Sequence, residues 1–168
     1  MDIPVFVSCP TSLSKRQAAS RSLILRQLAR FNLEPRAPGR SDYPTELPLR
    51  EVLLVARHCS GGVILGFEQY RGLTHVQHPG AARHQKHDTP VSMPTPWNHL
   101  EAGILFGLRL PLLIFREKEI EGGVVDRGVS DVFIHDMPAP GDNAARKAGL
   151  GDVFLKWQAE VRRHYYEA

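Results

Sequence analysis

The sequence predicts an α/β fold, a flavodoxin-like three-layer sandwich with a mostly parallel five-stranded sheet. Short apolar runs alternate with amphipathic segments along the 168 residues, which is the pattern of parallel strands joined by helices. Two of these runs, Pro4–Ser8 and Gly62–Phe67, are almost continuously apolar. Strands that are covered by helices on both faces have this composition.

The predicted elements follow in chain order. A first strand leads through a turn of small residues into a helix over 15–31, for which Ser14 is a suitable cap. A polar strand over 32–36 contains Pro35, which favours the edge of the sheet. After a proline-rich loop, the expected elements are a helix from about 48 to 58, a strand over 62–67, a helix over 97–108, a strand over 110–115, a last strand over 132–135 and a helix that ends near Tyr166.

The composition narrows the class of protein. Cys9 and Cys59 stand far apart in no metal-binding spacing, so we expect free thiols in a reducing cytoplasm. No apolar stretch approaches the ~20 residues that cross a bilayer, and we expect no secretory leader, because no charged region followed by an apolar run stands before the first strand. The net charge is only +3. We interpret the arginines of 15–31 as a solvated face, so we do not expect nucleic acid as a partner.

Within a single domain over 1–168, an irregular insert is expected at about 68–96. Loops of this length in compact domains are usually functional. Four histidines lie in it, but their spacing matches no zinc pattern and no cysteine accompanies them, so we expect no metal. They are His75, His78, His84 and His87.

Glu101 is the candidate catalytic residue. It lies in a helix that is otherwise apolar and has little surface for solvent, so the carboxylate is expected to face a cleft. In the flavodoxin-like strand order, ligands bind between the tips of the first and third strands. An ordinary exposed glutamate is the alternative interpretation.

Six further residues are expected to contact a substrate at those strand tips. Small residues after the first strand would let a ligand approach backbone N–H groups. Trp97 would stack on a flat ring or fill the core, and Asn98 would face the crevice or cap its helix. The six residues are Ser8, Cys9, Pro10, Phe67, Trp97 and Asn98.

The segment Trp97-Asn98-His99-Leu100-Glu101, with Ala102-Gly103 and Pro111-Leu112-Leu113-Ile114 after it, resembles the Toll/interleukin-1 receptor (TIR) domain pattern. The similarity extends over about residues 3 to 135. It implies a TIR-like domain in which Glu101 cleaves the nicotinamide–ribose bond of NAD, a substrate rather than a cofactor. It further implies homo-oligomers and a nucleotide signal, such as cyclic ADP-ribose, that reaches a separate effector in bacterial anti-phage defence.

The spacing from Glu101 through Gly103 and Gly107 to Pro111 also resembles nucleoside 2-deoxyribosyltransferases, which use a glutamate on this helix as nucleophile. Ordinary nucleosides need an acid for the leaving base, for which Glu68 is a candidate. A third alternative is a non-catalytic module that binds a nucleotide or a protein. Ser41-Asp42-Tyr43 stand where TIR domains usually have aromatic and basic loop residues.

Overall fold

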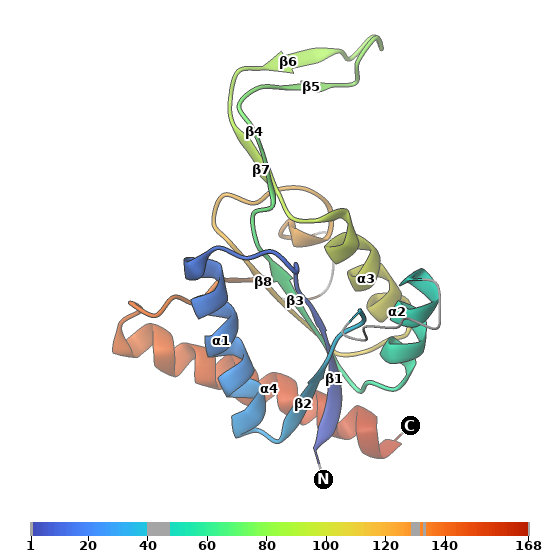
Figure 1. Cartoon of the computed structure of the whole chain (residues 1–168), viewed down its shortest axis with the longest axis vertical. Helices are drawn as coiled ribbons and strands as arrows, with labels where there is room; N and C mark the ends of the chain where they lie inside the picture. The colour runs from blue at the N-terminus through green and yellow to red at the C-terminus, as the bar shows by residue number, and fades with distance from the viewer. Residues whose placement is uncertain (1, 40–47, 129–131, 133, 168) are drawn as a thin grey trace.

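The computed structural model describes residues 2–39, 48–128, 132 and 134–167 (Figure 1). The loop residues Ser41, Asp42 and Tyr43 and the predicted strand residue Phe133 lie outside this part of the chain.

The sheet has five strands in the order β2-β1-β3-β8-β9, and every pairing in it is parallel. The predicted flavodoxin-like α/β fold is therefore confirmed. As predicted, the polar second strand lies at the edge, and the first and third strands are neighbours. The strands are β1 (Ile3–Ser8), β2 (Leu33–Arg36), β3 (Gly62–Gly66), β8 (Leu112–Arg116) and β9 (Ile134–Asp136).

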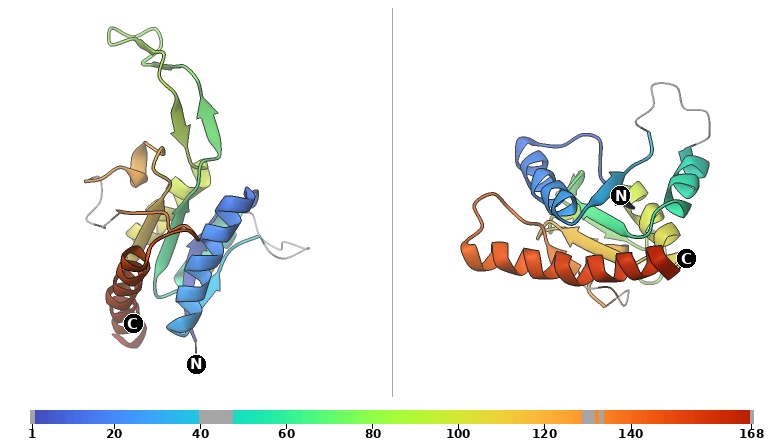
Figure 2. Two further views of the ribbon diagram at one scale, coloured as in Figure 1. Left: turned by 90° about the vertical axis from the view of Figure 1, so that its left-hand side faces the viewer. Right: turned by 90° about the horizontal axis from the view of Figure 1, so that it is seen from below.

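Helices cover both faces of the sheet (Figure 2). Alternation along each central strand divides the core, because successive side chains point to opposite faces. In β3, Val63 and Leu65 pack with α1 (Lys15–Arg30) and α4 (Ala144–Glu167), whereas Ile64 packs with α2 (Pro48–Arg57) and α3 (Pro96–Gly107). None of the described helices combines the length and apolar character needed to span a bilayer.

Local signals set where α1 and α3 begin. Ser14 and Gln17 form a reciprocal capping box at the start of α1. Thr95 caps α3, with Pro96 in the first turn where its missing N–H has no cost. Both helices start within one residue of the predicted positions.

Two glycines let the helices approach β3 closely. A Cβ at Gly62 would lie 2.7 Å from Leu105 Cδ1 of α3, and one at Gly61 would lie 2.6 Å from Val161 Cγ2 of α4. Cβ atoms essentially never lie at such distances, so glycine at position 62 lets α3 lie close to the strand, and glycine at position 61 does the same for α4.

The insert predicted as irregular is instead a β ribbon, which we call the arm (residues 68–93). β4 (Tyr70–Gly72) pairs antiparallel with β7 (Val91–Met93), and β5 (His75–Gln77) pairs with β6 (Gln85–His87). The arm projects from the end of the sheet at which β3 finishes (Figure 1). Cross-strand pairing, which short polar strands do not reveal in a sequence, orders this segment.

Candidate functional site

Glu101 lies in the second turn of α3 and is 7% exposed. The pairing of β1 and β3 and the packing of α3 on both strands place it beside the tip of β1. This is the position at which open α/β sheets bind ligands, where the strand order reverses. The alternative of an ordinary exposed glutamate is therefore excluded.

A chain of hydrogen bonds joins Glu101 to both central strands. The Asn98 side-chain amide donates to Ser8 Oγ at 2.8 Å and to the Leu65 carbonyl at 3.5 Å. The Ser8 hydroxyl donates in turn to the Glu101 carboxylate. The Thr95 hydroxyl donates to Asn98 Oδ1 at 2.9 Å and fixes the orientation of the amide.

Burial raises the pKa of Glu101 above the ordinary glutamate value, and the hydrogen bond from Ser8 opposes part of that rise. Desolvation disfavours the charged form, whereas a donor stabilises it. The carboxylate therefore combines a low-dielectric environment with an oriented donor. Such a group can stabilise a developing positive charge or act as a nucleophile.

The structure brings together some of the six predicted contact residues and separates others. Ser8 and Asn98 contact one another beside Glu101, and Cys9 and Pro10 follow Ser8 as half-buried residues. Trp97 is 44% exposed, so it does not fill the core and is available as a stacking surface. Asn98 does not cap α3, because Thr95 holds that position.

The prediction that Phe67 contacts a substrate is wrong. Phe67 is 0% exposed and belongs to the core between the sheet and the helices α1 and α4. It follows Val63 and Leu65 at intervals of two residues and points to the same side as they do, away from α3.

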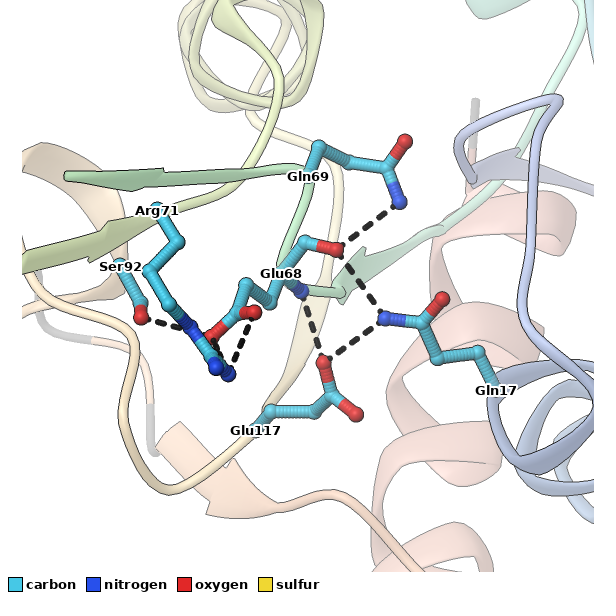
Figure 3. A network of polar contacts seen from close by, with 6 residues as sticks. All are labelled: Gln17, Glu68, Gln69, Arg71, Ser92 and Glu117. Atoms are coloured by element: carbon cyan, nitrogen blue, oxygen red, sulfur yellow. Dashed lines mark hydrogen bonds and ion pairs between the residues drawn. The ribbon is translucent and has the colours of Figure 1, made fainter.

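A second polar network surrounds Glu68 at the base of the arm (Figure 3). The Glu68 carboxylate accepts a hydrogen bond from Ser92 Oγ at 2.6 Å and pairs with Arg71 at 2.7 Å. Its backbone N–H donates to Glu117 Oε2 at 2.7 Å, and its carbonyl accepts from Gln17 of α1 at 3.1 Å. These contacts attach the arm to α1 and to the end of β8.

The hydrogen bonds from Ser92 and Arg71 lower the pKa of Glu68. The carboxylate is therefore ionised at neutral pH and holds no proton for a leaving base. This environment does not suit the acid role considered for Glu68.

The surroundings of Cys59 and His99 indicate structural roles for both residues. Burial raises the pKa of the Cys59 thiol to about 12, so it is not a nucleophile at neutral pH. His99 accepts a hydrogen bond from the backbone N–H of Val124, which anchors a short 3-10 turn (Gly123–Val125) against α3.

Two of the four histidines of the arm pair across it. The rings of His75 and His87 stack at 4.6 Å between centroids on opposite strands, and His84 accepts a hydrogen bond from the Gly80 N–H. Within residues 2–39, 48–128, 132 and 134–167, no three potential metal-ligating side chains gather into a cluster.

Two cavities of the structure lie away from Glu101. One of about 300 Å³ is lined by residues that include His135 and Arg146, beside α4. The other, of about 960 Å³, is lined by residues that include Phe106 and Trp157. Neither is lined by Glu101.

Sequence reasoning missed two residues that organise these networks. Thr95 precedes a proline and stands three residues before Asn98, the spacing of a helix cap, so this signal was available. Ser92 carries no comparable signal, because its partner Glu68 lies 24 residues away and is reached only through the pairing of the arm.

A comparison with models of known protein families finds none that matches the chain, and a comparison with curated proteins finds no match either.

Proposed function

We propose that the protein is an NAD-consuming enzyme of the TIR-like type, which cleaves the nicotinamide–ribose N-glycosidic bond with Glu101. The observation that carries the proposal is a nearly buried carboxylate that accepts a hydrogen bond from Ser8 between the tips of β1 and β3. The resemblance around Trp97 and Glu101 supports the choice of bond.

The chemistry requires little beyond such a carboxylate. As the bond between C1′ and the ring nitrogen breaks, its electron pair leaves with nicotinamide and positive charge develops on the ribose. Ionised Glu101 would stabilise that charge or form a transient ester at C1′. Water then adds at C1′ to give ADP-ribose and a proton, or a group of the same nucleotide adds to give a cyclic product.

The leaving group favours NAD over ordinary nucleosides. The nicotinamide nitrogen is already cationic, so it departs as a neutral molecule and needs no acid. A purine or pyrimidine must be protonated as it leaves, and Glu68, the acid considered for this step, is held ionised by Arg71 and Ser92. The deoxyribosyltransferase alternative therefore has weaker support.

The wider role follows from the resemblance alone. Homo-oligomers in the cytoplasm would release a nucleotide signal for a separate effector in anti-phage defence. Because Glu101 is 7% exposed, assembly or substrate binding would have to open the approach to it. The assay therefore covers a range of protein concentrations.

The test incubates the purified chain separately with NAD and with pairs of deoxynucleosides and free bases, and identifies products by mass spectrometry. The proposal predicts nicotinamide together with ADP-ribose or a cyclic isomer. Exchanged bases would support the deoxyribosyltransferase instead. Binding of NAD without turnover at every protein concentration would support the non-catalytic module.

A further inference from the structure

Helix α1 has a larger positive charge than the net charge of the whole chain. The sequence has 21 Lys and Arg against 18 Asp and Glu. Five of the basic residues lie in the 16 residues of α1, which contains no carboxylate. The rest of the chain, with 16 basic and 18 acidic side chains, has a net charge of −2. The five are Lys15, Arg16, Arg21, Arg26 and Arg30.

Four of these cations form one exposed surface, which we call the basic face of α1 (Lys15, Arg16, Arg26 and Arg30). At 100° per residue, they fall within an arc of about 100° around the helix axis and span about 22 Å along it. The buried residues Gln17, Ser20, Ile24 and Leu28 lie on the opposite side. Arg21 is half-buried at the margin.

The fold itself does not account for these charges. The ion pairs among the described residues involve Arg36, Arg71, Arg127 and Arg146, and none includes a residue of α1. Lys15 and Arg16 lie in the first turn, where the helix dipole disfavours cations. Arg30 has a local partner, the Phe31 ring at 5.9 Å from its guanidinium carbon.

We propose that the basic face of α1 binds the phosphate backbone of a nucleic acid. A row of cations about 22 Å long without carboxylates matches a polymer of evenly spaced negative charges, and such contacts are independent of sequence. This proposal does not depend on the reaction at Glu101. It revises the expectation that these arginines are only a solvated face.

Nucleic acid fits this surface better than a membrane does. Helices that lie in a bilayer interface insert large apolar side chains. Of the large apolar residues of α1, Ile24 and Leu28 are fully buried in the core and Leu23 and Leu25 are half-buried, so none of them is among the exposed large hydrophobic side chains. The surface therefore offers charge without a fully exposed apolar anchor.

The test measures fluorescence anisotropy of labelled 20-base-pair DNA and RNA duplexes, titrated with the full chain at several salt concentrations. Binding should weaken steeply with salt. Neutralising one phosphate contributes about −0.9 to the slope of log K against log salt, so four cations predict a slope of about −3 to −4. Vesicles of anionic lipid are titrated in parallel.

The decisive comparison uses two variants with the same change in net charge. Replacing the four residues of the basic face with Gln should weaken duplex binding at least tenfold. The control replaces four exposed cations elsewhere, Arg109, Lys147, Lys156 and Arg163, and should retain affinity within about threefold. Circular dichroism and thermal unfolding confirm that both fold. Equal losses in the two variants, no duplex binding at low salt, or binding to vesicles only would each overturn the proposal.

Discussion

Glu101 and Glu68 lie at the same end of the sheet but in opposite environments. Glu101 is buried against the core with a hydrogen bond from Ser8, and burial raises its pKa. Glu68 lies at the half-exposed base of the arm with Ser92 and Arg71, which lower its pKa. The same type of side chain thus has a raised pKa at one position of the fold and a lowered pKa at another.

The difference separates a candidate chemical role from a structural one. The carboxylate of Glu68 is satisfied by Ser92 and Arg71 of the arm, and its backbone groups bond to Glu117 and Gln17, which joins the arm to the body (Figure 3). Among the residues that the structure describes, Ser8 is the single donor to the Glu101 side chain, so the carboxylate retains acceptor capacity for a ligand. Environment, rather than residue type, thus distinguishes the candidate for catalysis.

The largest difference in stability between the two networks is expected when the side-chain amide of each, Asn98 or Gln69, is removed. Asn98→Ala removes partners from Ser8 and Thr95 in the buried network, at a cost of about 1–3 kcal/mol. Gln69→Ala should change the free energy of unfolding by less than about 0.5 kcal/mol, because the Glu68 carbonyl keeps its bond from Gln17. Urea denaturation measures both variants, and equal losses would contradict the contrast.

The next largest effect is expected in the pH dependence of stability that Glu101 causes. Because the pKa of Glu101 is raised on folding, the folded wild type binds more protons than the unfolded chain between the ordinary glutamate pKa and the raised one. Wild-type stability should therefore fall relative to Glu101→Gln as the pH rises through that window. Thermal unfolding of both proteins at several pH values measures this, and a constant difference would show that burial does not shift Glu101.

The smallest effect is expected at Glu68, with the opposite sign. Its pKa is lowered on folding, so its contribution is present above the ordinary glutamate pKa and is lost as the pH falls through the lowered value. The free energy of unfolding of the wild type should therefore increase relative to that of Glu68→Gln as the pH rises through that window. The increase should be small, because the pair with Arg71 is exposed to solvent. The same unfolding series measures it, and a trend parallel to that of Glu101→Gln would refute the comparison.

Much of the fold could be predicted because its signals are local. The apolar runs of β1 and β3 and the Ser14 cap each lie within a few residues. The arm could not be predicted in this way, because its strands have three residues each and pair across gaps such as that from His75 to His87.

The site was predictable only in part. An isolated carboxylate in an apolar helix identified Glu101, but the contact between Asn98 and Ser8 joins residues 90 positions apart and depends on the packing of α3. The error at Phe67 was avoidable, because alternation from Val63 and Leu65 already directs it to the other face.

The role of Glu101 is tested most directly by nicotinamide release from NAD, compared among wild type, Glu101→Gln and Glu68→Gln under identical conditions. Glutamine keeps the size of the side chain and an acceptor for Ser8 but removes the charge. We expect release to fall by about 100-fold or more in Glu101→Gln and to stay within about threefold of wild type in Glu68→Gln, with both variants folded. Undiminished release from Glu101→Gln, or an equal loss in both, would contradict the assignment of the chemistry to Glu101.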